Sequence, residues 1–321
     1  MGVLIEARNL SRSFGEFWAV RDVSFGVSSG EIFGLVGPDG AGKTTIMRLL
    51  CGAYLPDKLP EGEDPQIFLG GYDLIRDPEM ARSQIGYMPQ RFSMYEELTV
   101  LENIRFFAEV RGQARSDWLG SCMQILDFVG LAEYIHRRAG YLSGGMKQKL
   151  GLAAALVHHP RVLLLDEPTT GVDPVTRQDF WQLIIRLVTR EDNPAEGTAV
   201  FVSTPYMDEA ARCTRIGFML HGRLVEQGTP SELQQSLAER IIELSGSPLP
   251  LLRRIAKECQ VVEDVQVFGD RLHLRVKAGK TGEAIALLEN QIKLQGGQIL
   301  SLGVISPQLE DVFMNFSRDF G

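Results

Sequence analysis

Eight residues near the start of the chain, Gly37-Pro-Asp-Gly-Ala-Gly-Lys-Thr44, fit the pattern GxxxxGK[ST] without a gap. The apolar run at 31–37 predicts a buried strand before the pattern, and a helix is predicted at 43–50. In such a strand–turn–helix unit, glycines let backbone N–H groups close around phosphate oxygens at the positive end of the helix. The pattern therefore predicts an α/β fold that holds a phosphate group at this turn.

The side chains of this turn have different roles toward a polyphosphate. Lys43 supplies a positive charge for the β- and γ-phosphates, and the Thr44 hydroxyl can bind Mg²⁺. Asp39 is unusual here, because a carboxylate beside a triphosphate repels it unless it points away or pairs with a cation. The residues predicted to bind the phosphates are Gly37, Pro38, Asp39, Gly40, Ala41, Gly42, Lys43, Thr44 and Thr45.

Two further apolar runs, 162–165 and 199–203, predict buried strands that end in polar residues. Strands separated by helices, with polar residues at their ends, are typical of a parallel α/β sheet. Asp166 and Glu167 follow the first of these runs. Asp166 can hold the coordination shell of Mg²⁺, and Glu167 can polarise an attacking water. An acidic strand end is a weak signal alone, and it gains meaning from the phosphate-binding turn.

The chain changes character near residue 230. Thr229-Pro-Ser-Glu232 combines a threonine cap, a proline and a glutamate three residues after the cap, which predicts a helix start. The elements expected after it follow the order β-α-β-β-α-β of the ferredoxin-like arrangement. We therefore expect a small α+β domain at 235–321 after a first domain at 1–230. Its expected strands are 240–244, 261–268, 271–276 and 298–304, and its expected helices are 251–259 and 281–294.

Composition limits the class of protein. The chain has 33 basic and 41 acidic residues, a net charge of -8, which argues against a general nucleic-acid surface. The four cysteines stand far apart, without metal-ligand spacing, as in a reduced cytoplasmic protein. No apolar run reaches the roughly 18–20 residues of a membrane span, and the first residues form no secretion signal. We expect a cytoplasmic protein that binds no nucleic acid and reaches a membrane only through a partner.

A second anion site is predicted in Leu142-Ser-Gly-Gly-Met-Lys-Gln148, where a Ser-Gly-Gly turn opens a helix. One nucleotide cannot use two separate phosphate cradles of one chain. Here the sequence resembles the ATP-binding cassette (ABC) ATPases, whose signature is LSGGQ, over about residues 3–230. The other matching elements are Phe14 of Ser-Phe-Gly, Gln90 of Gly-Tyr-Met-Pro-Gln, and Gly171-Val-Asp173.

The resemblance implies a P-loop NTPase core with an antiparallel β subdomain and an α-helical subdomain at about 92–150. It also implies a head-to-tail dimer with a second ABC subunit, as a homodimer or a heterodimer. ATP would lie between the Lys43 loop of one subunit and the turn of Ser143, Gly144 and Gly145 of the other.

The residue roles that the resemblance implies follow the motifs. ATP is the expected nucleotide, with Mg²⁺ bound at its phosphates. Phe14 would stack on the adenine ring, and Glu167 and Gln90 would be catalytic. The expected Mg²⁺ ligands are Thr44, Gln90 and Asp166.

Two segments resemble parts of ATPases that serve membrane proteins. The stretch 92–107, after Gln90, is similar to the exporter-type segment against which a membrane subunit presses a coupling helix. The closing stretch 306–313 resembles the tail of ATPases that serve ABC-2-type export permeases. The resemblance therefore implies the ATP-hydrolysing subunit of an exporter, peripheral on the inner face of the cell membrane through integral permease subunits.

One element departs from the family's pattern. Where members carry a histidine in Ser-Thr-His-x-Met-Asp-Glu-Ala, this chain has Pro205, which has neither a side-chain donor nor a backbone N–H. Pro205 therefore leaves open a nucleotide-binding regulatory partner with impaired hydrolysis. A separate alternative is a soluble ABC ATPase acting on ribosomes or DNA. His158 and His159 are expected to form a cation pair at a helix end, and His273 to lie at the surface. Residues 55–71, with three prolines, are expected to form an exposed loop.

Overall fold

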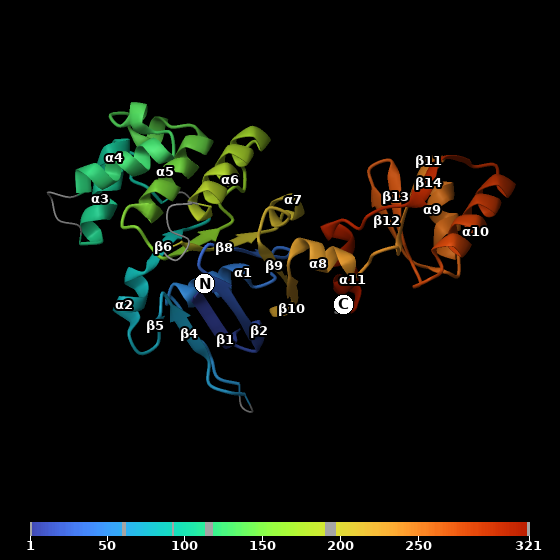
Figure 1. Ribbon diagram of the computed structural model, residues 1–321, viewed down its shortest axis with the longest axis horizontal. Helices are drawn as coiled ribbons and strands as arrows, with labels where there is room; N and C mark the ends of the chain where they lie inside the picture. Colours follow the sequence, from blue (N-terminus) through green and yellow to red (C-terminus); the bar gives the residue numbers. More distant parts are fainter. Residues whose placement is uncertain (1, 60–61, 92, 113–117, 190–196, 320–321) are drawn as a thin grey trace. The chain divides into compact units, whose positions relative to one another are not determined.

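The computed structural model describes residues 2–59, 62–91, 93–112, 118–189 and 197–319 (Figure 1). The contacts within the chain divide it into two compact units, Met1–Gln227 and Gly228–Gly321. No helix among the described residues is long and apolar enough to cross a membrane.

The first unit opens with a long antiparallel hairpin. Strands β1 (Val3–Phe14) and β2 (Phe17–Ser28) pair along their whole length. Strand β4 (Gln66–Leu69) pairs with β1, so the prediction of an exposed loop over 55–71 is wrong at its C-terminal end. The physical reason is that the two apolar side chains at alternate positions of β4 are buried in the core of the unit. The sheet order is β2-β1-β4-β5, with β5 at Tyr72–Asp73.

The second sheet of this unit has six strands in the order β10-β9-β3-β8-β7-β6. The strands from β9 to β6 run parallel, which confirms the predicted parallel α/β sheet. The three predicted strands, β3, β7 and β8, are buried at every residue. The sequence does not predict β6, because its four residues include Gly86 and Tyr87 and form no apolar run. The bounds are β3 Ile32–Val36, β6 Ile85–Met88, β7 Val162–Asp166, β8 Ala199–Thr204, β9 Arg215–Leu220 and β10 Arg223–Gly228.

Three helices of the first unit, α3, α4 and α5, pack on one another and form a separate group in Figure 1, as the predicted helical subdomain requires. Of the residues predicted for that subdomain, Phe92 and 113–117 lie outside the described residues. The bounds are α1 Lys43–Leu50, α2 Pro78–Ser83, α3 Val100–Val110, α4 Trp118–Phe128, α5 Gly144–Leu156, α6 Pro174–Val188 and α7 Met207–Ala210.

Three stacked aromatic rings join the two sheets of the first unit. Phe25 of β2 lies 5.5 Å from Phe33 of β3 and 5.0 Å from Phe201 of β8, measured between ring centroids. All three side chains are buried. Aromatic side chains of this size dominate the energetics of a core. The stack therefore fixes the antiparallel sheet on the parallel sheet that carries the phosphate-binding turn.

The second unit has the predicted β-α-β-β-α-β order and a four-stranded antiparallel sheet, β12-β13-β11-β14. Strands β11 and β12 flank β13, which is the split β-α-β arrangement of ferredoxin-like folds. The capping box at Thr229 and Glu232 begins α8, as predicted. The bounds are α8 Pro230–Gln235, β11 Ile241–Ser247, α9 Leu249–Glu258, β12 Val262–Phe268, β13 Arg271–Val276, α10 Thr281–Leu294, β14 Gln298–Val304 and α11 Leu309–Asp319.

The prediction that His273 lies at the surface is wrong. This histidine of the second unit is only 4% exposed. Its Nδ1 lies 2.9 Å from Oδ1 of Asp311, a buried residue of α11, and its ring lies against Phe268. The sequence does not predict α11. It therefore does not predict that α11 covers the His273 side chain.

Candidate functional site

The phosphate-binding turn joins the end of β3 to the start of α1. A Cβ on Gly42 would lie 2.3 Å from the backbone oxygen of Ala19, and its φ of +108° is in the region that favours glycine. Backbone approaches the turn equally closely at Gly37, where a Cβ would lie 2.3 Å from the backbone oxygen of Met219. Asp39 is exposed. The turn thus has no room for a side chain at these two glycines, and within it the N–H of Ala41 donates to the carbonyl oxygen of Pro38 at 3.2 Å.

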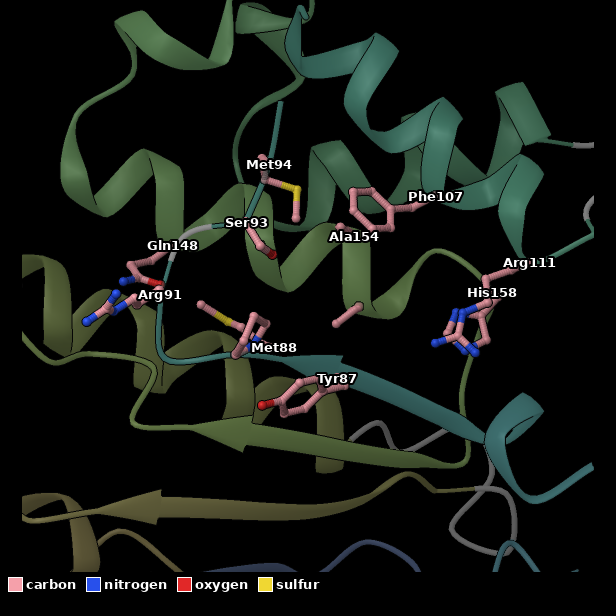
Figure 2. Close-up of a pocket in the computed structure, with 13 residues that line it drawn as sticks. Tyr87, Met88, Arg91, Ser93, Met94, Phe107, Arg111, Gln148, Ala154 and His158 are labelled. Atoms are coloured by element: carbon pink, nitrogen blue, oxygen red, sulfur yellow. The ribbon is translucent and has the colours of Figure 1, made fainter. Parts of the chain in front are cut away.

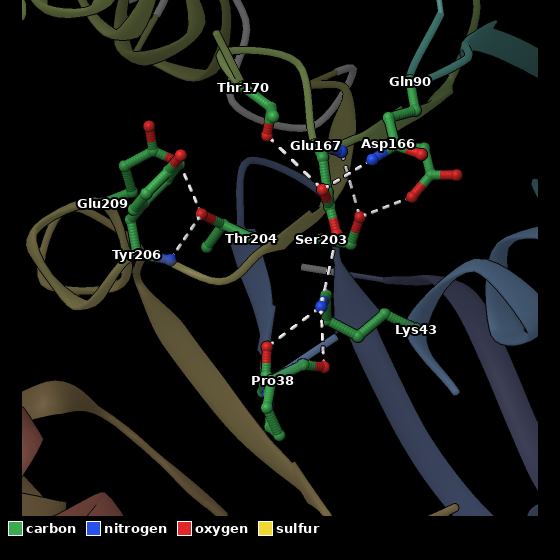
Figure 3. A network of polar contacts seen from close by, with 11 residues as sticks. Pro38, Lys43, Gln90, Asp166, Glu167, Thr170, Ser203, Thr204, Tyr206 and Glu209 are labelled. Atoms are coloured by element: carbon green, nitrogen blue, oxygen red, sulfur yellow. Dashed lines mark hydrogen bonds and ion pairs between the residues drawn. The ribbon is translucent and has the colours of Figure 1, made fainter. Parts of the chain in front are cut away.

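Lys43 lies at the centre of a buried polar network. Its Nζ donates to the carbonyl oxygens of Gly37 (2.9 Å) and Pro38 (3.1 Å) and lies 3.2 Å from Oε1 of Glu167. Gln90 donates from Nε2 to Oε2 of Glu167 at 2.8 Å. Figure 3 shows these side chains converging from the turn, from the segment after β6 and from the end of β7. The structure therefore brings together three residues that the sequence places far apart.

The backbone of Glu167 has a φ of +48°, a conformation that few residues other than glycine adopt. Its N–H donates to Oγ of Ser203 at 3.0 Å and to the Ser203 carbonyl oxygen at 3.2 Å. Ser203, near the end of β8, thus holds the unusual conformation that directs the Glu167 side chain toward Lys43. The sequence signal for Ser203 is that β8, like β7, ends in polar residues.

Asp166 is the buried carboxylate beside this network. Its Oδ1 accepts from Oγ of Ser203 at 2.7 Å, and the Thr44 side chain also bonds to it. Burial raises the pKa of the Asp166 carboxyl above its ordinary value, and the charge of Glu167 adds to this effect. A threonine hydroxyl, an aspartate carboxylate and the Gln90 amide oxygen are the hard oxygen donors that Mg²⁺ prefers. The donor types present therefore fit the predicted metal.

Phe14, the predicted adenine platform, is 45% exposed at the end of β1. Tyr54 packs edge-on against it with ring centroids 5.5 Å apart. The Arg12 guanidinium lies over both rings, at 5.3 and 5.4 Å from their centroids. Tyr54 and Arg12 are not predicted from the sequence, because no motif marks them and only the fold brings them to Phe14. Together the two rings and the guanidinium, which pairs with Asp57 at 3.0 Å, form an aromatic surface of the kind on which a base can stack.

The second predicted cradle lies at the start of α5. Ser143 is the N-cap, and its Oγ accepts from the backbone N–H of Met146 at 3.3 Å. Ser143 and Gly144 are exposed, whereas Gly145 is buried against Thr176. Across the described ranges, no hydrogen bond or ion pair joins this turn to the Lys43 loop. The structure therefore does not bring the two predicted phosphate cradles of one chain together.

The loop after β8 carries Pro205, which is half-buried. Thr204 donates from Oγ1 to Oε2 of Glu209 at 2.6 Å and accepts from the backbone N–H of Tyr206 at 3.1 Å. The Tyr206 ring lies 4.4 Å below the guanidinium of Arg177 on α6. That ring is thus engaged in a cation–π contact, which argues against Tyr206 as a replacement for the missing histidine.

A cavity of about 240 Å³ lies between β6, α3 and α5 (Figure 2). Its floor and walls include Met88, Met94 and Phe107, and Arg91 and Arg111 lie at its border. The cavity is thus mostly apolar with two cations beside it. It lies in the segment that the sequence predicts to receive a membrane subunit.

His158 also lines this cavity. Its Nε2 lies 3.0 Å from the carbonyl oxygen of Ile85, and burial lowers its pKa to about 4, with Arg111 adding to the shift. The predicted cation pair of His158 and His159 is therefore wrong, because His158 is neutral near pH 7.

Comparison with known proteins gives matches along almost the whole chain. The family model described as ABC transporter matches residues 20–170. The chain is 39% identical over 304 residues to the probable multidrug ABC transporter ATP-binding protein YbhF of Escherichia coli (strain K12), covering 92% of this chain and 49% of that protein. It therefore spans about half the length of that relative.

Two other known proteins match this chain over most of their own length. The chain is 34% identical over 318 residues to the Nod factor export ATP-binding protein I of Rhizobium sp. (strain N33), covering 98% of this chain and 97% of that protein. A solved ATP-binding subunit of an ABC transporter is 28% identical, with a TM-score of 0.62 over 73% of this chain and 92% of that one.

The depressed pKa of His158 predicts a pH dependence of stability. Between about pH 6.5 and 4 the unfolded chain binds a proton at this residue while the folded chain does not. The free energy of unfolding should therefore fall as the pH falls through this window, and less so in His158→Gln. Chemical denaturation of both proteins at several pH values measures the effect. Two parallel curves would contradict the assignment.

Proposed function

This chain belongs to the ATP-binding proteins of the ABC transporter family, and we propose that it is the nucleotide-binding subunit of an exporter. It hydrolyses ATP at the interface of two cassettes and so drives transport through separate membrane subunits. The observation that carries the proposal is the network in which buried Lys43 and exposed Gln90 both contact the buried Glu167, beside Asp166. The exporters named among the relatives support transport over action on ribosomes or DNA.

Lys43 supplies the positive charge for phosphate. In the described structure its anionic partner is Glu167, so phosphate oxygens would take the place of that carboxylate. The N–H groups of the turn and the N-terminus of α1 add donors to the same site. Thr44, Gln90 and Asp166 would hold Mg²⁺, which when bound offsets negative charge on the phosphates.

Glu167 accepts a proton from the attacking water in this proposal. Gln90 holds one oxygen of the carboxylate at 2.8 Å, which fixes the direction of the other. Once Lys43 turns to phosphate, Oε1 of Glu167 is available to a water beside the phosphate. Gln90 thus has two proposed roles, as a support for the base and as a metal ligand.

A second ABC subunit completes the site in this proposal. Ser143 and Gly144 are exposed and do not contact the Lys43 loop of their own chain. Two chains related by a twofold axis can exchange these turns, so that each turn meets the nucleotide of the other chain. Phe14, with Tyr54 beside it, would hold the adenine.

The partner in the membrane is proposed to be an integral permease of the ABC-2 type. The apolar cavity between β6, α3 and α5 is a suitable place for a short helix of that permease. The chain would then lie in the cytoplasm, peripheral on the inner face of the membrane. We assign the ATPase to residues 1–230, with a helical subdomain at about 92–150, and an accessory domain to 235–321.

A second candidate function is a regulatory subunit with impaired hydrolysis. Pro205 has no donor, and the Tyr206 ring is held against Arg177. A missing positioned polar group in such a site typically costs about 10²–10³ in rate. This candidate shares the nucleotide site and differs only in turnover.

Lys43→Ala should weaken ATP binding at least tenfold, because it removes a hydrogen bond to a charged group, worth about 1.5–3 kcal/mol. Calorimetry with Mg-ATP measures the dissociation constant. Lys149→Ala is the matched control, since Lys149 lies on α5 and pairs only loosely with Asp179, at 4.0 Å. Unchanged affinity in Lys43→Ala, with an intact fold, would contradict the phosphate site.

Pro205→His should raise the rate of phosphate release several-fold or more, because a histidine can donate where proline cannot. Glu167→Gln, which keeps the shape of the side chain but is a far weaker base, should bind ATP and release little phosphate. Steady-state phosphate release at matched protein concentration compares both with the wild type. A wild type that turns over at about 1 s⁻¹ or faster, with no gain from the histidine, would rule out impaired hydrolysis.

Extraction of the chain from membranes in detergent tests the proposed partner. We expect an integral membrane protein to co-purify with it in a stable complex. Ribosomes or DNA in the complex, with no integral membrane protein, would overturn the transport proposal. Phe107→Asp, which puts a charge into the apolar cavity, should weaken the complex while ATP affinity stays the same.

A further inference from the structure

Glu209, on the short helix α7, has a carboxylate with both oxygens engaged by buried hydroxyls. Oε1 accepts from Oγ1 of Thr169, and Oε2 accepts from Oγ1 of Thr204 at 2.6 Å. Glu209 and Thr169 are each 1% exposed and Thr204 is fully buried. In Figure 3 the contact between Glu209 and Thr204 lies on the side of the loop after β8 that faces away from Lys43. One carboxylate therefore ties the loop after β7 to the end of β8.

The charge of this carboxylate also has a partner. Nε of Arg177, on α6, lies 3.6 Å from Oε1 of Glu209, and the same guanidinium covers the Tyr206 ring. A buried carboxylate is stable only when its charge and its lone pairs are satisfied. The arrangement is thus a closed group, in which loss of the carboxylate would leave two hydroxyls buried without an acceptor.

Both tied loops carry residues of the proposed chemistry. Thr169 comes two residues after Glu167, and Thr204 stands between Ser203 and Pro205. Ser203 in turn holds the backbone of Glu167 and the carboxylate of Asp166. A shift of either loop would therefore move the Glu167 carboxylate relative to the phosphate-binding turn.

We infer that Glu209 is a positioning residue for ATP hydrolysis, which fixes Glu167 and residue 205 relative to each other by joining Thr169 to Thr204. The inference rests on the proposed function. Both oxygens of the buried Glu209 carboxylate are already engaged, so we expect it to act on the rate through Glu167 and not on the affinity for ATP.

Glu209→Ala and Glu209→Gln in the full chain test this role, with Asp208→Ala as matched control. Asp208 is the exposed acidic neighbour on α7 and lies 3.8 Å from Arg177. Calorimetry gives the dissociation constant of Mg-ATP, and single-turnover phosphate release gives the rate. These two numbers separate positioning from binding, and a melting curve monitors the fold.

We expect Glu209→Ala to lower the rate at least tenfold with the dissociation constant changed less than twofold. Glu209→Gln should recover to within threefold of wild type, because its amide can accept from one hydroxyl and donate to the other. Asp208→Ala should stay within twofold. A rate in Glu209→Ala within twofold of wild type, or equal losses of rate and affinity, would overturn the inference.

Thr169→Val covers the case in which Glu209→Ala does not fold. It keeps the bond between Glu209 and Thr204 and releases only the loop after β7, so the same loss of rate without loss of affinity is expected. A wild-type rate in Thr169→Val would overturn the inference. A wild type that neither binds ATP nor releases phosphate would overturn the proposed function, and this inference with it.

Discussion

A buried ion pair joins Lys43 at the start of α1 to Glu167 after β7, with Nζ and Oε1 3.2 Å apart and both side chains less than a tenth exposed. Removal of two such charges from water costs several kcal/mol for each, so the pair is stable only with further polar partners. The carbonyl oxygens of the phosphate-binding turn and the Gln90 amide supply them. The turn, the end of β7 and the segment after β6 must therefore all be in place before the pair can form.

The same ion pair explains how an anion-binding site can stay folded without its anion. Lys43 is the first residue of α1, and a positive charge at the N-terminus of a helix is unfavourable. Glu167, which follows β7, offsets that charge, and Ser203 holds the backbone conformation that this requires. A ligand of this site must therefore compete with a carboxylate of the protein, and only a strongly anionic group such as a polyphosphate can do so.

The parts of the structure that the sequence predicts are those set by local pattern. The buried strands β3, β7 and β8 follow from apolar runs, and the P-loop follows from its spacing of glycines. The order of the second unit follows from its alternating periodicities. Contacts between distant segments were not predictable in this way. Tyr54 beside Phe14 and Glu209 beside Thr169 depend on how strands line up in the sheet, and no local pattern records that.

The errors have a similar origin. His273 and His158 are polar residues in segments that read as exposed, and each is covered by an element distant in the sequence. In both cases the covering element supplies a partner for one ring nitrogen, whereas Nδ1 of His158 is buried without a hydrogen-bond partner. A polar side chain is thus a poor indicator of the surface when a fold can supply it with a partner.

Helix α5 connects the exposed Ser143 cap to the wall of the cavity, and this connection has a mechanical consequence. It starts at the exposed Ser143 cap, and Gln148, Gly151 and Ala154 along it line the cavity beside β6. Its 13 residues form one continuous helix of about 20 Å, and hydrogen bonds along its axis make such a helix stiff over that length. Force applied at the cap by a neighbouring molecule would reach the wall of the cavity as a displacement of similar size, with no hinge between them.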